Sequence, residues 1–235
     1  GGILTGSLAA GALAFIGLSA SAIIFFAGDV ETKVTVFSTK IMPEAFIRMF
    51  LLLMTHTLYR FRIIGRDHVP DYGGVLLVPN HVSFVDGLFL LASVDRPIRF
   101  VIDRKYYERP FLNWVSRVID VIPIASEGTQ EEILSAIREA GRRLDQGELV
   151  CIFPEGLTTQ IGNLLPFHQG FERILKGRDT PVIPVHLDRV WGSSFSFIGG
   201  KFLAKWPQRI PYPVTIAYGL PLPVSYTHLT LPTSD

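Results

Sequence analysis

Short apolar runs alternate with helical patterns over most of the chain, and the two periodicities predict its elements. Strands are predicted over seven runs: 61–64, 74–78, 98–102, 118–122, 149–153, 182–187 and 214–218. Helices are predicted between them at 86–92, 110–117, 129–144 and 171–176. The 129–144 segment is the clearest, because apolar residues recur there at helical spacing and Gly147 follows. Strands that alternate with helices indicate an α/β fold with a mostly parallel twisted sheet flanked by helices.

The beginning of the chain has a different pattern, because Asp29 is its first charged residue. Twenty-five helical residues would extend about 38 Å, and the hydrocarbon core of a bilayer is about 30 Å thick. A signal peptide fits less well, since no basic region precedes the apolar stretch. Small side chains recur every four residues, as suits packing against other membrane helices: Gly2, Gly6, Ala10 and Ala14. We therefore predict a transmembrane helix at 1–28 that is the remnant of a larger membrane domain.

The segment 29–60 is predicted to be a linker with an interfacial or re-entrant helix, because 45–54 is apolar except for Arg48. A buried core helix is an equal alternative. Basic residues follow the first helix and predict, by the positive-inside rule, that the rest of the chain is cytoplasmic: Lys33, Lys40, Arg48, Arg60, Arg62 and Arg66. A single globular domain is expected at 61–223. The last segment, 224–235, resembles a translated sequencing adapter and is expected to be a non-native tail.

The composition agrees with a membrane-associated protein and excludes several other classes. Hydrophobic residues make up 48% of the chain, and the mean hydropathy is +0.34. A net charge of +1 argues against a nucleic-acid surface. The single cysteine, Cys151, excludes an internal disulfide and a cysteine-based metal cage, and the six histidines are not at metal-binding spacings. No metal site is predicted.

A histidine and an aspartate five residues apart, His81 and Asp86, directly follow the apolar run 75–79. The end of a strand in an open α/β sheet is where such folds place their ligands. An imidazole beside a carboxylate can take a proton from a hydroxyl group, while the carboxylate holds the tautomer. The alternative is structural: Ser83 to Asp86 also fits a helix capping box, and His81 would then be a buried side chain.

A second turn, Phe153-Pro154-Glu155-Gly156, follows the apolar run 149–152. An ordinary turn would explain this composition. Two polar turns at the ends of two strands, each with an ionisable residue, are more typical of one shared site.

These motifs, in this order, resemble those of the lysophosphatidic acid (PlsC-like) glycerolipid acyltransferases. The resemblance rests on Asn-His-Val-Ser-Phe-Val-Asp at 80–86, Phe-Pro-Glu-Gly at 153–156 and Val-Ile-Pro-Val at 182–185. It covers roughly 44–223. The branch that is most similar has this domain fused after a lysophospholipid-transporter-like membrane domain, and an adjoining transporter domain is therefore expected.

The resemblance implies a chemistry and a set of residues. His81 would be the general base on the acceptor hydroxyl, and Asp86 would orient it; amides at the start of the Asp86 helix are candidate oxyanion donors. Glu155 and Gly156 would place the glycerol backbone or the hydroxyl, and Pro184 would shape the acyl side of the cleft. The full set of implied substrate-binding residues is Asn80, Ser83, Arg104, Phe153, Glu155, Gly156, Thr158 and Pro184.

The resemblance also implies partners and a location. No cofactor is bound; the acyl donor is a thioester of acyl carrier protein or coenzyme A, and the acceptor is a lysophospholipid taken from membrane lipids. The expected location is the bacterial cytoplasmic (inner) membrane, with the catalytic domain on its cytoplasmic face.

The chain departs from the family pattern at three places. Family members often have basic residues there, whereas this chain has Ser126, Thr158 and the pair His168-Gln169. Arginine is the usual bidentate partner of a phosphate dianion. We therefore predict a phosphodiester acceptor such as lysophosphatidylethanolamine, unless other basic residues compensate: Arg104, Lys105 or Arg173. Two alternatives stay open: a lysophosphatidic acid acyltransferase that makes phosphatidic acid, and a non-catalytic lysolipid-binding domain of a lipid transporter.

Overall fold

The computed structural model describes residues 57–83, 85–107, 116–193, 196–197 and 210–222, with single positions at 49, 53 and 113. In these ranges no helix is both long enough and apolar enough to cross a membrane. The predicted transmembrane helix at 1–28, most of the 29–60 segment and the tail at 224–235 lie outside the described residues. Those predictions stay predictions.

The described part of the chain is built on a seven-stranded sheet of order β1-β7-β6-β2-β5-β3-β4. The strands are β1 (Tyr59–Ile64), β2 (Val75–Pro79), β3 (Ile98–Asp103), β4 (Ile122–Ile124), β5 (Leu149–Cys151), β6 (Val182–Asp188) and β7 (Tyr212–Tyr218). The strands β6, β2, β5, β3 and β4 are mutually parallel. At the other end, β7 pairs antiparallel with β6 and parallel with β1. The prediction of a mostly parallel α/β sheet is confirmed.

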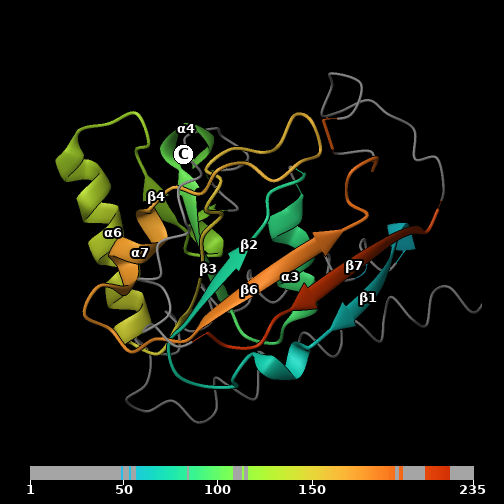
Figure 1. Ribbon diagram of the computed structural model, residues 1–235, viewed down its shortest axis with the longest axis horizontal. Helices are drawn as coiled ribbons and strands as arrows, with labels where there is room; N and C mark the ends of the chain where they lie inside the picture. Colours follow the sequence, from blue (N-terminus) through green and yellow to red (C-terminus); the bar gives the residue numbers. More distant parts are fainter. Residues whose placement is uncertain are drawn as a thin grey trace, which may run out of the picture. The chain divides into compact units, whose positions relative to one another are not determined.

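Helices cover the two faces of this sheet. They are α3 (Asp86–Ser93), α4 (Arg104–Tyr107), α6 (Gln130–Asp145) and α7 (Gly170–Leu175), with a 3₁₀ turn at Arg66–His68. In Figure 1, α6 and α7 lie side by side, and α3 lies behind β6. Neighbouring residues of β2 point to opposite faces: Leu77 packs in the apolar cluster that contains α3, and Leu76 packs in the cluster that contains α6 and α7.

The helix α6 shows how closely the sequence signals can determine an element. Its amino end has a capping box, in which the Thr129 hydroxyl accepts from the Glu132 amide and the Glu132 carboxylate accepts from the Thr129 amide. Its buried face consists of Ala136, Ile137, Ala140, Gly141 and Leu144. The prediction of a helix at 129–144 is correct to within one residue at each end.

The strand predicted at 118–122 is displaced along the chain, because it overlaps the observed β4 only at Ile122. A helical turn continues through residue 118, Asp120 has a positive φ of 54°, and β4 begins only at Ile122. Ile119 and Val121 are buried, but they precede the strand and are not part of it. An apolar run alone does not separate a strand from a buried turn that precedes one. Of the helix predicted at 110–117, positions 113, 116 and 117 are helical and the others lie outside the described residues.

Candidate active site

The loops that follow β2 and β5 meet at one edge of the sheet, because these strands are parallel neighbours. His81 is the second residue after β2, and Glu155 lies in the turn after β5. The His81 amide donates to Glu155 Oε1 over 2.7 Å. The structure thus brings together the two motifs that the sequence places 74 residues apart.

The side chains of His81 and Asp86 form a hydrogen-bonded pair. His81 Nδ1 lies 3.0 Å from Asp86 Oδ2, and the same oxygen accepts from the amides of Val82 (2.7 Å) and Ser83 (2.8 Å). Asp86 is fully buried, whereas the His81 side chain keeps 22% of its surface exposed. A fixed carboxylate at Nδ1 leaves Nε2 as the nitrogen that can receive a proton.

Burial is the dominant influence on Asp86. Desolvation raises the pKa of its carboxyl group above the ordinary value, and the hydrogen bond and charge of His81 offset part of this shift. In the described part of the chain, Asp86 Oδ1 has no hydrogen-bond partner. The ionised form of Asp86 is therefore held at a cost in stability, and that cost is smallest when His81 carries a positive charge.

The alternative role of Asp86, as part of a helix capping box with Ser83, is met only in part. The Ser83 amide donates to the Asp86 carboxylate as in a capping box, but the Ser83 hydroxyl accepts from Val85 instead of Asp86. The amides of Asp86 and Leu88 donate to the carbonyl oxygens of Ser83 and Val85. Those two amides are therefore engaged within the turn and are not available as oxyanion donors.

The second ring nitrogen of His81 faces the turn after β5. Thr158 Oγ1 lies 3.2 Å from His81 Nε2, at the position where an acceptor hydroxyl would have to bind. The Phe153 ring stacks on the His81 ring, with 4.2 Å between centroids and 27° between planes. Stacking on one side and a hydroxyl at Nε2 leave the imidazole oriented for proton transfer.

Glu155 has a different place from the one that its motif implies. It is 3% exposed, and its second carboxyl oxygen, Oε2, accepts from the Leu165 amide over 2.7 Å. Both oxygens are thus engaged by backbone amides, those of His81 and Leu165. The carboxyl group thus ties together the two loops that form the site, and the expected contact of Glu155 with the glycerol backbone or the hydroxyl stays a prediction.

This geometry predicts a loss of stability for Glu155→Gln. A glutamine amide has one acceptor oxygen, so one of the two buried amides would face an NH₂ group. We expect the free energy of unfolding to fall by about 1–3 kcal/mol, measured by urea denaturation. The matched control is Glu127→Gln, at an exposed position. An unfolding free energy like that of the control would contradict the assigned role.

Gly156 is required by the shape of the turn. Its φ is +67°, and a Cβ atom would lie 3.0 Å from Cδ2 of His168. Both facts oppose any other residue at this position. The predicted contact of Gly156 with a substrate stays a prediction.

The other predicted substrate contacts are Asn80, Ser83, Arg104 and Pro184. The Asn80 side-chain amide exchanges two hydrogen bonds with the backbone of Leu187, which fixes the His81 loop to the end of β6. Ser83 is fully buried, which argues against direct contact with a substrate. Arg104 pairs with Glu132 over 2.8 Å. Pro184 is an exposed residue within β6, and its carbonyl oxygen accepts from the Gly219 amide.

Two contacts of the site could not be expected from residue types. The Thr159 amide donates to the His81 carbonyl oxygen over 2.9 Å, and the Leu165 amide donates to Glu155. Backbone donors have no signature in the sequence.

Across the described ranges, no group of three or more His, Cys, Asp or Glu residues is arranged to hold a metal ion.

Fold and site together define an α/β protein with a histidine, held by a buried aspartate, at the carboxyl edge of a mostly parallel sheet. The chain belongs to the acyltransferase family, because the family model described as Acyltransferase matches residues 60–188, more than half of its length. The prediction of a PlsC-like acyltransferase, and hence of an enzyme, is confirmed at this level. The predicted fusion to a transporter domain is not addressed by these matches.

Individual relatives are distant. The 1-acyl-sn-glycerol-3-phosphate acyltransferase of Helicobacter pylori is 30% identical over 50% of this chain and 49% of that protein. The chloroplastic 1-acyl-sn-glycerol-3-phosphate acyltransferase of Brassica napus is 23% identical over 60% of this chain and 40% of its own length. The chain thus spans about half or less of these relatives.

A solved structure supports the fold. The crystal structure of the 1-acyl-sn-glycerophosphate acyltransferase PlsC from Thermotoga maritima superposes with a TM-score of 0.63 at 19% identity. The match covers 94% of this chain and 86% of that one.

Proposed function

We propose that the protein transfers a fatty acyl group from an acyl thioester to the free hydroxyl group of a lysophospholipid. The observation that carries the proposal is the His81–Asp86 pair, which leaves His81 Nε2 beside the hydroxyl of Thr158. An acceptor hydroxyl that takes the place of the Thr158 hydroxyl at this nitrogen would be in position to lose its proton. Membership of the acyltransferase family supports the reaction class.

In the proposed reaction, His81 Nε2 takes the proton from the acceptor hydroxyl as its oxygen attacks the thioester carbonyl carbon. The carbon–sulfur bond then breaks, and the proton passes from His81 to the leaving sulfur. Asp86 keeps the other ring nitrogen protonated and stabilises the imidazolium. No covalent acyl-enzyme is needed, and neither is a bound cofactor.

The acceptor headgroup has two candidates, each with its own support. The relatives named above act, by their names, on 1-acyl-sn-glycerol-3-phosphate, which makes lysophosphatidic acid one candidate. A phosphodiester such as lysophosphatidylethanolamine is favoured by the uncharged Thr158 at His81. Two basic residues near the strand ends have carboxylate partners already: Arg104 pairs with Glu132, and Lys105 lies 3.9 Å from Asp103.

We further propose that the acceptor is taken from the cytoplasmic face of a bacterial inner membrane. Support comes from the uncharged segment 1–28 and from the basic residues that follow it. The donor is proposed to be acyl carrier protein or coenzyme A, both of which present a thioester.

The test is acyl transfer in membranes that carry the protein or its His81→Ala variant. Labelled acyl groups are supplied on acyl carrier protein or coenzyme A, and the acceptors are lysophosphatidic acid and lysophosphatidylethanolamine. Transfer that requires His81 supports the enzyme, and the better acceptor identifies the headgroup class. Folded protein that binds lysolipid but transfers nothing would favour the non-catalytic reading.

A substitution at Thr158 separates the two headgroups. Thr158→Arg introduces a guanidinium group beside the reacting nitrogen, and its bidentate bonds favour a phosphate dianion. We expect the ratio of kcat/KM for lysophosphatidic acid to that for lysophosphatidylethanolamine to rise about tenfold, since one charged hydrogen bond contributes about 1.5–3 kcal/mol. Thr158→Gln, of similar length but neutral, is the matched control. An equal change in both variants would contradict the role of charge.

A further inference from the structure

The loop between β5 and α7 exposes large apolar side chains beside the candidate active site. We call residues 157–167 the apolar loop. Its exposed apolar residues are Leu157 (57% exposed), Ile161 (68%), Leu164 (63%) and Phe167 (47%). Four such side chains on one short loop are more than a domain surrounded by water ordinarily presents.

The same stretch lacks charge. Between Glu155 and Glu172 the chain has no aspartate, glutamate, lysine or arginine, and His168 is its one ionisable residue. A solvent-exposed loop usually carries charged residues. Exposed apolar side chains on an uncharged loop suit contact with a lipid bilayer, whose apolar core lies beneath a polar headgroup layer.

Hydrogen bonds fix the apolar loop to the site. The Leu165 amide donates to Glu155, the Thr159 amide donates to the His81 carbonyl oxygen, and the His168 amide donates to the Pro154 carbonyl oxygen. The loop also approaches Trp191, because a Cβ atom on Gly162 would lie 2.8 Å from its ring. Exposure of the four apolar side chains is therefore a property of a loop that is held in place, directly next to His81.

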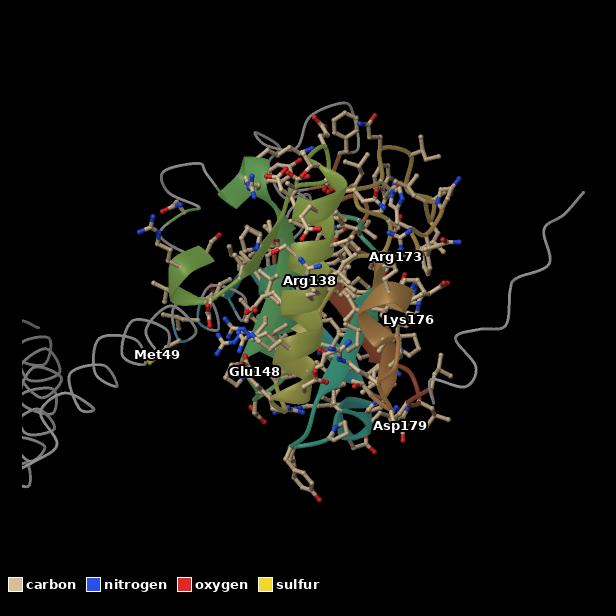
Figure 2. The ribbon with its side chains drawn as sticks, turned by 90° about the vertical axis from the view of Figure 1, so that its left-hand side faces the viewer. Met49, Arg138, Glu148, Arg173, Lys176 and Asp179 are labelled. Atoms are coloured by element: carbon tan, nitrogen blue, oxygen red, sulfur yellow. The ribbon has the colours of Figure 1, made fainter. Side chains whose placement is uncertain are left out.

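Two basic residues follow the apolar loop in the sequence, on α7 and directly after it. Arg173 on α7 and Lys176 directly after it are exposed, and Figure 2 shows both at the surface along this helix. Phe167 packs edge-on against Phe171 in the first turn of α7, with 6.5 Å between ring centroids. An apolar contact flanked by basic side chains matches the interface of an anionic bilayer, where apolar groups enter below the headgroups.

We propose that the apolar loop is a lipid-contacting element that inserts Leu157, Ile161, Leu164 and Phe167 into the surface of an anionic bilayer. The proposal rests on the proposed function, because a lysophospholipid acceptor must reach His81 from that surface. Docking by this loop places His81 and Thr158 near the level of the lipid headgroups. The binding partner of the apolar loop is the lipid bilayer itself.

The first test measures depth and needs no catalysis. An environment-sensitive fluorophore is attached to Leu164→Cys in the full chain, which is reconstituted in phosphatidylglycerol–phosphatidylethanolamine vesicles. Labelling is selective because Cys151, the one native cysteine, is fully buried. The matched control is Leu220→Cys, at a position that is 68% exposed against 63% for Leu164. Leu220 lies two residues before Leu222, the partner of Val182 at the start of β6, and so at the opposite edge of the sheet.

We expect phospholipids with a spin label on the upper acyl chain to quench the probe at 164 at least threefold more than the probe at 220. Equal quenching, or emission at 164 that matches the probe in water, would overturn the proposal. A probe at 164 that becomes buried only when acyl carrier protein is added would overturn it in favour of a protein partner.

The second test measures transfer. The double variant Ile161→Ser, Leu164→Ser is expected to raise the KM for a vesicle-borne acceptor at least tenfold, with little change for a short-chain acceptor that is monomeric in water. Equal loss for both acceptors would overturn the proposal. Quenching at 164 without acyl transfer would uphold the lipid contact and reject the enzyme, whereas transfer without quenching would do the reverse.

Discussion

Replacement of His81 by alanine is expected to lower the rate of acyl transfer by about 10²–10⁴-fold, the usual contribution of a general base. The alanine side chain cannot accept the proton from the acceptor hydroxyl, and His81 Nε2 is the group that contacts Thr158 Oγ1 in the structure. The rate is measured at saturating acceptor, so that it reports the chemical step rather than binding. Residual transfer would come from substrate positioning and from groups that stabilise the oxyanion.

The control for this variant is His186→Ala. His186 is exposed on β6 and pairs across the sheet with Ala217. Its neighbours Val185 and Leu187 bond Asn80 through their backbones, which a side-chain substitution at 186 leaves in place. Its substitution should leave the rate within about twofold of the parent, the range expected for a surface change. The base assignment fails if His81→Ala keeps a rate close to that of His186→Ala while both proteins remain folded.

Local signals predict the frame of this site well. Apolar runs place β2 and β5, and the five-residue spacing of His81 and Asp86 corresponds to a single hydrogen-bonded turn at the start of α3. The residues of this turn are close in the chain, so their geometry depends little on the rest of the fold. The expectation that two strand-end turns form one site also holds, because β2 and β5 are adjacent and parallel.

Long-range features are where prediction from sequence ends. Glu155 looks like a substrate ligand in its motif, but its two partners are backbone amides at positions 81 and 165, and a backbone amide is the same in every sequence. Asn80 likewise has its partner 107 residues away. The antiparallel direction of β7 also has no local signature, because its apolar alternation fits either direction.

Asp86 shows how the site trades stability for function. Its carboxylate must be charged to stabilise the imidazolium of His81, yet it is fully buried and one of its oxygens has no partner within the described residues. Asp86→Asn removes the charge but keeps the size. We expect it to lower the acyl-transfer rate by about 10³–10⁴-fold, as loss of the orienting aspartate does in catalytic triads, while the free energy of unfolding stays equal or rises.

The raised pKa of Asp86 also predicts the direction in which the free energy of unfolding changes with pH. Burial raises the pKa of Asp86 in the folded protein above its value in the unfolded chain. Between these two values the folded protein binds the extra proton, so this carboxyl group makes stability fall as the pH rises through the window. The window begins near the ordinary aspartate pKa of about 3.9 and ends at the raised value. Asp86→Asn lacks the effect, and its stability relative to the parent should therefore increase with pH across the window.

Urea denaturation of both proteins at several pH values measures that difference. A relative stability of Asp86→Asn that decreases with rising pH would mean that the folded state favours the charged carboxylate, against the effect of burial.

Repeating the urea series in the His81→Ala background gives a second test. The hydrogen bond and charge of His81 lower the pKa of Asp86, so their removal should extend the window upward and enlarge the gain from Asp86→Asn. Stability and catalysis then respond in opposite directions to the same carboxylate, as expected for a buried charge that is kept for its chemistry.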